Sequence, residues 1–324
     1  MYKIGLDIGY GNTKIVTENK KICFPSLAKQ GEKINMSNML SASGDYIATI
    51  NDKIWYVGHM AAKESRFAIR AFDDAERFNN PAFQAMLSTA LAVATDEDEV
   101  MLITGLPLSS YKTSQENFQK FLSGFSTKVE INDQTKHIKV KQAYVFPQAA
   151  GIFFNSDFHK YNSTFNPGDL VMIMDIGYRT TDVATFEYTK GKPELMIEHS
   201  FTADAGMVSV FRPLADRIAE NKGMFAAPLE SAERVFLNNN PEYQVVIDSF
   251  CQEAVENIAE SFKLNGPGKD RTVHIIAAGG GSVALNSYLE KQFPNIILLN
   301  EAQFANAIGF YEVGTRLDAI NIFD

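Results

Sequence analysis

The segment Ile4-Gly-Leu-Asp-Ile-Gly-Tyr-Gly-Asn-Thr-Lys-Ile-Val16 decides the fold, because the chain repeats it as Met172-Ile-Met-Asp-Ile-Gly-Tyr-Arg-Thr-Thr-Asp-Val-Ala184. When Asp7 is aligned with Asp175, the tetrapeptide Asp-Ile-Gly-Tyr is identical in the two copies. Each copy is an apolar, β-branched run followed by Asp, a Gly-containing turn, Thr and a second β-branched run, which is typical of a strand–turn–strand unit. The repeat therefore predicts two similar hairpins, each with a carboxylate at the end of its first strand.

The residues of the two predicted turns suit a phosphate group. Glycine at the bend allows a positive φ and brings backbone N–H groups close to a ligand. Lys14 adds a cation to the strand that leaves the first turn, and hydroxyl residues follow both bends. Two such loops facing each other would clamp a polyphosphate, with Asp7 and Asp175 holding a hydrated Mg²⁺ between them. For either loop alone, an ordinary hairpin with a surface Asp explains the pattern equally well.

The composition is that of an ordinary globular protein with the length of two domains. The 324 residues include 30 Lys+Arg and 39 Asp+Glu, a formal net charge of −9. This acidic balance argues against direct binding of nucleic acid or an anionic membrane, both of which need a basic surface, and leaves room for a basic protein partner. The two cysteines indicate no disulfide framework, and neither a signal peptide nor a membrane span is evident. We expect a cytoplasmic protein.

Periodicity and turn residues predict alternating strands and helices around the two repeats. The acidic and basic runs at 96–99 and 136–141 are interpreted as solvated surfaces, the second as the wet face of a strand. A helix is expected to begin after Pro147 and to fade near His159. The other expected elements are a hairpin at 46–57, a strand pair at 129–145, strands at 100–103, 273–278 and 296–299, and helices at 81–95, 113–124, 204–222, 228–238, 250–263, 283–292 and 301–317.

Gly279-Gly280-Gly281-Ser282 lies between a predicted buried strand and a predicted helix. A glycine-rich bend at this position is common in nucleotide-binding proteins, because the backbone can approach the ligand at the glycines. The spacing is not G-x-G-x-x-G, so it does not indicate a dinucleotide site. A tight packing bend is the alternative interpretation.

The order of these motifs along the chain resembles that of the actin/Hsp70/sugar-kinase superfamily: a first phosphate loop, a connecting helix, a second phosphate loop and an adenosine loop. Finer features are similar to the prokaryotic actin-like proteins, in particular the ParM/StbA plasmid-segregation group and the archaeal actin-like proteins near it. These features are Tyr56-Val-Gly-His-Met-Ala61, Thr104-Gly-Leu-Pro107, Pro147-Gln148 and Phe304-Ala-Asn-Ala-Ile-Gly-Phe-Tyr311.

The resemblance implies the two-domain α/β fold of actin-like ATPases, made of duplicated ribonuclease-H-like domains with a nucleotide in the cleft between them. Domain I is then expected at 1–165, with a small inserted subdomain at about 25–80. Domain II is expected at 166–324, and its terminal helix at about 301–317 crosses back to domain I.

The resemblance also assigns roles to single residues. Asp7 and Asp175 match the aspartates that act on Mg²⁺ through water, Lys14 matches a lysine that touches the β- and γ-phosphates, and Gln148 matches the residue that orients the attacking water. Gln148, Asp7 and Asp175 are thus the expected catalytic residues. The other nucleotide-binding positions are Gly9, Tyr10, Gly11, Asn12 and Thr13 in the first loop, Gly177, Tyr178, Arg179, Thr180 and Thr181 in the second, and Gly206, Gly279, Gly280 and Gly281. Arg179 departs from the Gly found in many members, and Tyr10 and Tyr178 are also expected to contribute packing.

The function implied by the resemblance is that of a polymerising ATPase whose filaments segregate plasmid DNA. The expected cofactors are ATP, with GTP left open, and Mg²⁺. The expected partners are further copies of the chain and a DNA-binding adaptor protein on the plasmid centromere. Two alternatives remain at this stage: a small-molecule kinase of the same fold, with Asp182 or Asp204 as its base, and an ATP-binding scaffold that does not polymerise.

Overall fold

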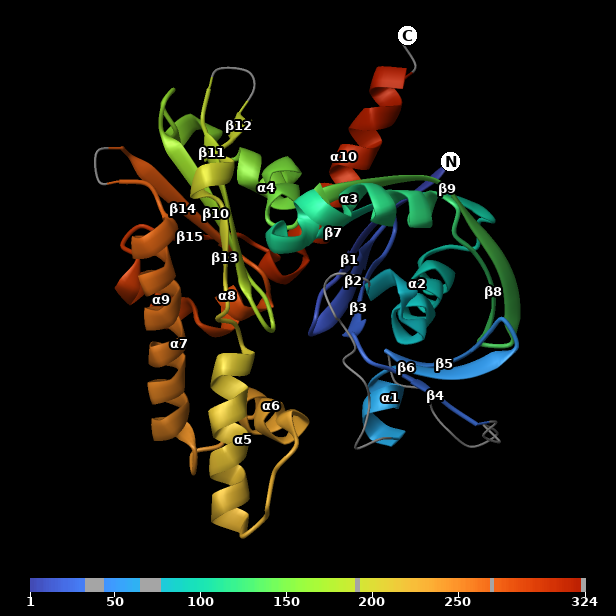
Figure 1. The fold of residues 1–324 in the computed structure, drawn as a ribbon, viewed down its shortest axis with the longest axis horizontal. Helices are drawn as coiled ribbons and strands as arrows, with labels where there is room; N and C mark the ends of the chain where they lie inside the picture. The colour runs from blue at the N-terminus through green and yellow to red at the C-terminus, as the bar shows by residue number, and fades with distance from the viewer. Residues whose placement is uncertain (33–43, 65–76, 190–192, 269–270, 322–324) are drawn as a thin grey trace. The chain divides into compact units, whose positions relative to one another are not determined.

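The computed structural model describes residues 1–32, 44–64, 77–189, 193–268 and 271–321, and these form two compact units (Figure 1). Unit 1 comprises Met1–His159 and Phe304–Asp324, and unit 2 comprises Lys160–Gln303. Much of the small subdomain expected at about 25–80 falls on residues 33–43 and 65–76, which lie outside the described residues.

Unit 1 is built on a mixed sheet whose described strands run in the order β3-β2-β1-β7-β9-β8-β5-β6-β4. The central strands β1, β7 and β9 are parallel, and the remaining pairs are antiparallel. The strands are β1 (Tyr2–Ile8), β2 (Asn12–Val16), β3 (Lys21–Pro25), β4 (Ala28–Gln30), β5 (Asp45–Ile50), β6 (Lys53–Gly58), β7 (Glu99–Leu106), β8 (Ser126–Ile131) and β9 (Gln134–Pro147). The helices are α1 (His59–Glu64), η1 (Arg77–Asn79), α2 (Pro81–Ala94), α3 (Leu108–Ser123), η2 (Ala150–Phe154), α4 (Ser156–His159) and α10 (Ala305–Asn321).

Helix α2 forms the centre of the unit 1 core. The side chain of Asn80 caps its N-terminus by accepting a hydrogen bond of 2.8 Å from the Ala82 N–H, and Pro81 occupies the first turn. Nearly all of its small, apolar side chains are buried, and the sheet curves around it (Figure 1). The helix predicted at 81–95 is confirmed.

Helix α10 covers the strand that carries Asp7. It approaches β1 closely at Gly5, where an added Cβ would collide with the backbone of Ala307 and Tyr311. The absence of a side chain at Gly5 thus lets the helix backbone lie directly on the strand.

Unit 2 contains a second mixed sheet in the order β12-β11-β10-β14-β15, with β13 paired to β11. Strands β10, β14 and β15 are parallel, as β1, β7 and β9 are in unit 1. The strands are β10 (Leu170–Ile176), β11 (Thr181–Glu187), β12 (Glu194–Leu195), β13 (Phe201–Ala203), β14 (Val273–Ala278) and β15 (Ile297–Leu298). The helices are η3 (Asn162–Thr164), η4 (Ile197–His199), α5 (Val208–Lys222), α6 (Leu229–Leu237), α7 (Gln244–Asn265), α8 (Gly280–Ala284) and α9 (Asn286–Gln292), followed by η5 (Ala302–Phe304) at the boundary.

The core of unit 2 lies between β10 and the helices. Met172, Met174 and Ile176 of β10 are buried in one cluster with apolar residues of α5, α7 and α9. Helix α5 ends at Gly223, which adopts a left-handed conformation with φ 61°. Within the described part of the chain, none of the helices combines the length and the apolar character needed to cross a bilayer.

Several expected helix boundaries were wrong, among them the start of α3, which is Leu108 rather than residue 113. No continuous helix follows Pro147: Ala149 has φ 65°, η2 is a 3-10 helix, and Asn155 is extended before the short α4. Helix α7 begins at Gln244 rather than near 250. In the glycine-rich segment the bend is confined to Gly279, and Gly280 already opens α8.

Candidate functional site

The two repeated segments form hairpins with the same register. Strands β1 and β2 place Asp7 opposite Lys14, and β10 and β11 place Asp175 opposite Asp182. The same backbone hydrogen bond closes both turns, from the Gly9 N–H to the Asn12 carbonyl at 3.2 Å and from the Gly177 N–H to the Thr180 carbonyl at 2.9 Å. The strand–turn–strand prediction is therefore confirmed for both copies. The turns are called the first loop (residues 8–13) and the second loop (residues 176–181).

Glycine suits the two loops because a side chain would be crowded there, and not because the backbone has positive φ. Neither Gly9, Gly11 nor Gly177 is among the described glycines with positive φ, so that expectation was wrong. A Cβ on Gly9 would lie 3.3 Å from the Asn12 carbonyl oxygen, and one on Gly177 would lie 3.1 Å from that of Thr180. A side chain at either position would crowd the turn that a phosphate would approach.

The first loop carries a connected group of three predicted site residues. Lys14 Nζ donates to Asp7 Oδ2 at 2.9 Å, and Gln148 Nε2 donates to Asp7 Oδ1 at 3.2 Å. Asp7 is 4% exposed and Gln148 is 7% exposed. The carboxylate thus holds the ammonium group on one oxygen and the amide on the other. Residues 141 positions apart in the sequence are brought together because β1 and β9 both flank β7.

The buried threonines of the loops serve the loop structure. Thr13 is fully buried and shares a hydrogen bond of 2.9 Å with the hydroxyl of Ser26, whose N–H donates to the Gly11 carbonyl at 2.9 Å. Thr181 is also fully buried, and its hydroxyl donates to the Ala205 carbonyl at 2.6 Å. Sequence reasoning missed Ser26. Its position directly after Pro25, where β3 ends, was the available signal.

The second loop is attached to the start of α5. The Met207 N–H donates to the Gly177 carbonyl at 3.2 Å, and the Val208 N–H donates to the Tyr178 carbonyl at 2.7 Å. Gly206 lies so close to this loop that an added Cβ would be 2.7 Å from the Arg179 carbonyl carbon. The structure therefore places Gly206 directly beside the second loop.

Asp182 is 4% exposed, and its Oδ1 accepts a hydrogen bond of 2.6 Å from the Thr202 hydroxyl. It stands where the first hairpin has a lysine, so two carboxylates face each other across β10 and β11. Asp204, the other candidate base of the kinase alternative, is exposed.

The glycine-rich segment packs against the end of β10. Gly279 has φ 85°, and an added Cβ would collide with Asp175 Oδ1 and the Ile176 carbonyl. Its N–H donates to the Ala302 carbonyl at 2.8 Å, and the Ser282 hydroxyl donates to the Gly279 carbonyl at 2.7 Å. The structure thus places the predicted adenosine loop directly beside the predicted metal-binding aspartate.

The remaining predicted site residues divide into packing and exposed positions. Tyr10 packs on the unit 1 core, and the ring of Tyr178 lies 5.9 Å from that of Phe211. Asn12 and Thr180 are half-buried in their turns, Arg179 is exposed, and Gly280 faces the side chain of Gln303.

Cys23 lies opposite Lys14 on β3, beside the first loop. Burial raises the pKa of its thiol, although the nearby Lys14 charge acts in the opposite direction. A thiol with a raised pKa is a weak nucleophile at neutral pH, so Cys23 contributes packing rather than chemistry.

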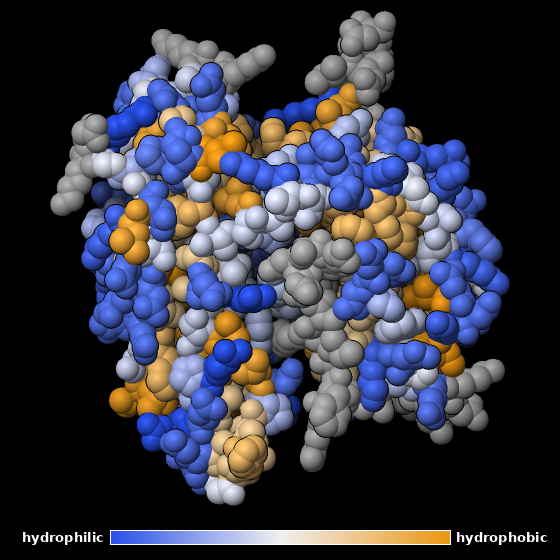
Figure 2. Space-filling view, viewed as in Figure 1, coloured by the Kyte–Doolittle hydropathy of each residue, from blue (hydrophilic) through white to orange (hydrophobic). Residues whose placement is uncertain are grey.

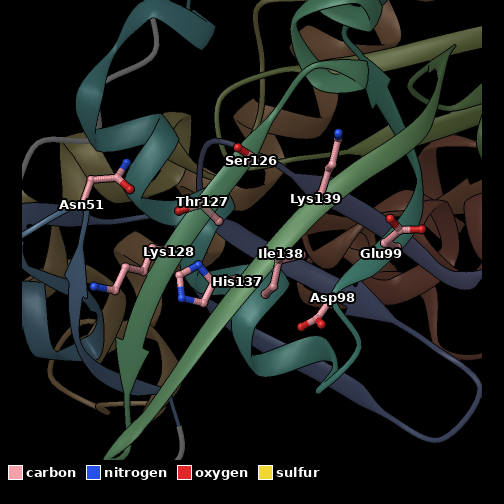
Figure 3. A pocket seen from close by; sticks show the side chains of 9 residues that line it. All are labelled: Asn51, Asp98, Glu99, Ser126, Thr127, Lys128, His137, Ile138 and Lys139. Atoms are coloured by element: carbon pink, nitrogen blue, oxygen red, sulfur yellow. The ribbon is translucent and has the colours of Figure 1, made fainter.

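A hollow of about 430 Å³ lies on the outer face of β8 and β9, and none of the predicted site residues lines it (Figure 3). Lys128, His137 and Lys139 line it together with Asp98 and Glu99, so its charges are mixed. The exposed and buried residues of β9 alternate here, as the prediction of a wet strand face requires. The hollow is a solvated sheet surface.

Comparisons with known proteins find similarity to actin-like proteins along nearly the whole chain. A family model for the N-terminal domain of actin-like proteins matches residues 5–151, and one for the C-terminal part of the archaeal MreB-like actin homologue matches residues 173–291. An archaeal actin homologue of Thermoplasma acidophilum is 25% identical over 98% of this chain and 99% of its own length.

Solved structures show the same fold. A 15-stranded ParM filament from Clostridium botulinum gives a TM-score of 0.86 at 23% identity, covering 97% of this chain and 99% of that chain. An archaeal actin homologue in complex with ADP gives 0.78 at 22% identity, covering 98% and 100%. From the two family models and the two-domain α/β architecture, the chain belongs to the actin-like proteins and has the fold of ParM and the archaeal actin homologues.

Proposed function

We propose that this protein binds a nucleoside triphosphate with its two loops, hydrolyses it, and assembles into filaments. The observation that carries the proposal is the arrangement at Asp7, whose two carboxylate oxygens accept hydrogen bonds from Lys14 and Gln148. A cation from β2, a carboxylate from β1 and an amide that follows β9 meet here, and these are groups that phosphoryl transfer to water uses. One archaeal relative was solved with ADP, which supports a nucleotide as the ligand.

Each residue has a distinct part in this proposal. Lys14 neutralises phosphate charge, and the N–H groups of both loops donate to phosphate oxygens. Gln148 cannot act as a base, but its amide orients a water molecule while Asp7 holds the amide in place. Asp7 and Asp175 would bind the water shell of Mg²⁺, which supplies charge neutralisation at the phosphates when it is bound.

The donor set fits a magnesium ion that retains water and phosphate ligands. Among the described residues, no group of three or more His, Cys, Asp or Glu side chains could enclose a metal ion. Mg²⁺ usually keeps several waters and binds through one or two carboxylates together with substrate phosphates. One aspartate at each loop is consistent with that mode, with ATP as the expected nucleotide.

Filament formation is supported by the relatives and by the surface. A structural relative was solved as a ParM filament. Hydrophobic colour appears on the surface around α5 and α6 (Figure 2), and the exposed large apolar residues there include Met224, Phe225 and Leu237. Exposed apolar residues that gather in one region often mark protein–protein contacts. We extend the proposal to plasmid DNA segregation through a DNA-binding adaptor, consistent with the net charge of −9.

The kinase alternative has less support. It needs an accessible carboxylate as its base, whereas Asp182 is buried and accepts a hydrogen bond from Thr202. Asp204 is exposed, but within the described residues no neighbouring group holds it by a hydrogen bond or an ion pair.

Right-angle light scattering and phosphate release, followed in one cuvette after addition of Mg·ATP, test the proposal. We expect scattering to rise above a critical concentration, with phosphate release lagging behind. Gln148→Ala should slow phosphate release by about 100-fold and prolong the scattering plateau, with nucleotide affinity little changed, because only the water loses its orientation.

Gln119→Ala, on α3, is the matched control and should behave as the wild type. Flat scattering with tight ATP binding would eliminate polymerisation and favour the scaffold alternative. Phosphate release that is equally fast in Gln148→Ala would eliminate the assigned role of Gln148.

A further inference from the structure

Gln148 is followed by the most unusual backbone conformation near the first loop. Ala149 has φ 65° and ψ −42°, close to the dihedral angles of the γ-turn with positive φ, which an L-residue with a side chain rarely adopts. Ala149 is fully buried, so the conformation is enforced by its surroundings. Strained residues of this kind persist only where neighbouring contacts hold them, and they gather at functional sites.

One side chain from α10 holds this turn. Asn306 Oδ1 accepts a hydrogen bond of 3.2 Å from the Ala149 N–H, and Asn306 is itself 4% exposed. On the other side of the turn, the Gln148 N–H donates to the Leu106 carbonyl at 2.7 Å. The N–H groups of Gln148 and Ala149 thus donate to two different elements, β7 and α10. Between these two anchored N–H groups, the Gln148 side chain extends to Asp7.

The packing of α10 fixes the position of Asn306. Residues 306, 309 and 310 lie on one face of the helix by their spacing. Gly309 meets the backbone of Gly151 so closely that an added Cβ would be 2.8 Å from the Gly151 carbonyl carbon. A Cβ on Gly151 would in turn be 2.9 Å from Phe310 Cζ. The segment after Gln148 and the start of α10 are therefore packed as one rigid piece.

We propose that Asn306 is a positioning residue for hydrolysis, because it stabilises the strained turn at Ala149 and thereby directs the amide of Gln148 toward Asp7. This rests on the proposed function, in which Gln148 orients the attacking water. It also gives a role to Phe304-Ala-Asn-Ala-Ile-Gly-Phe-Tyr311, which nothing in the two loops explains.

Asn306→Leu removes the acceptor oxygen and keeps the number and branching of the side-chain heavy atoms. We expect phosphate release at saturating nucleotide to fall about tenfold or more, since a small misplacement of a catalytic group has an effect of that order. Nucleotide affinity should remain within about twofold, because no group proposed to bind the nucleotide is changed. Asn306→Asp, which keeps an acceptor oxygen, should stay close to the wild-type rate.

The sharpest test is a second-site rescue. Glycine adopts positive φ without strain, so Ala149→Gly should restore most of the activity lost in Asn306→Leu. Ala150→Gly in the same background is the matched control, because Ala150 does not have positive φ. Ala150→Gly should restore none of the phosphate release lost in Asn306→Leu. Equal rescue by both glycines, or rescue by neither, would overturn the proposal.

Hydrogen exchange at the Ala149 amide gives a readout that does not depend on hydrolysis. In nucleotide-free protein the amide should be protected in the wild type and in Asn306→Asp, and should exchange at least tenfold faster in Asn306→Leu. Unchanged protection would overturn the assigned contact. If the wild type fails to hydrolyse nucleotide while exchange follows this pattern, the proposed function and the catalytic part of the inference fail, but the holding of the turn by Asn306 stands.

Discussion

The first and second hairpins share one backbone design and differ in charge at the position that pairs with the aspartate. Both place an aspartate seven residues before its cross-strand neighbour, and both close with the same turn hydrogen bond. In the first hairpin the neighbour is Lys14, which pairs with Asp7 at 2.9 Å. In the second hairpin the neighbour is Asp182, so two acidic residues, Asp175 and Asp182, lie opposite each other on the paired strands.

The difference in charge indicates that the two hairpins have different functions. Asp7 is held by two side-chain donors and can orient Gln148 before any ligand arrives. Asp175 lies against Gly279 and opposite another carboxylate, a setting in which a bound cation relieves repulsion. We therefore expect the first hairpin to govern the rate of hydrolysis and the second to govern the dependence on Mg²⁺.

The largest expected effect is that of Asp7→Ala compared with Asp175→Ala. Asp7→Ala removes the acceptor of both Lys14 and Gln148 and should reduce single-turnover phosphate release by at least about 100-fold at saturating nucleotide. Asp175→Ala should act mainly by raising the Mg²⁺ concentration needed for half-maximal rate. A larger rate effect from Asp175→Ala at saturating Mg²⁺ would reverse the assignment.

Alanine at the glycine that packs against the second hairpin should destabilise the protein more than alanine in the turn of the first hairpin. At Gly279 an alanine must adopt φ 85° and collide with Asp175 Oδ1, so Gly279→Ala should lower the free energy of unfolding by about 2 kcal/mol or more. At Gly9 the added Cβ would be 3.3 Å from its nearest neighbour, so Gly9→Ala should have less than half that effect. Urea unfolding of the two variants measures the difference, and equal losses would contradict it.

Asp182→Asn should make the second hairpin less dependent on magnesium. The change removes one of two facing negative charges, and opposed like charges across a strand pair destabilise by roughly 0.2–1 kcal/mol. We expect the melting temperature without Mg²⁺ to rise and the further increase caused by Mg·ATP to shrink. Asp204→Asn, on an exposed residue, is the control and should change neither. A lower melting temperature in Asp182→Asn would indicate that its hydrogen bond with Thr202 outweighs the repulsion.

The smallest effect on stability is expected from a substitution of Asp169, at the opposite end of β10 from Asp175. Asp169 Oδ2 accepts hydrogen bonds from the Asn166 N–H at 2.9 Å and from His274 Nε2 at 2.8 Å. The Asn166 hydrogen bond first, and then His274, lower the pKa of Asp169 below its ordinary 3.8.

A carboxyl group whose pKa is lowered by folding adds stability above its unfolded pKa, and this stability is lost as the pH falls through the folded value. Asp169→Asn should therefore be less stable than the wild type at pH 7, with the difference decreasing below pH 3.8. Urea unfolding at several pH values measures this. A difference that grows toward low pH would contradict it.

The sequence by itself determined the duplicated hairpins, the matching positions of Asp7 and Asp175 in them, and the family. These are local features: a period-two apolar pattern, a bend and a carboxylate at a fixed spacing, which short-range physics turns into a strand, a turn and a strand. The buried α2 and its Asn80 cap could be predicted for the same reason.

Only the tertiary structure decided how Gln148 is presented. The segment after Pro147 looks helical in sequence, yet the backbone breaks at Ala149, because the Leu106 carbonyl accepts from the Gln148 N–H and the Asn306 side chain accepts from the Ala149 N–H. Those partners lie 42 residues before Gln148 and 157 residues after Ala149, so no local pattern could show them. The sequence supplies the chemical groups of the site, and long-range packing gives them their direction.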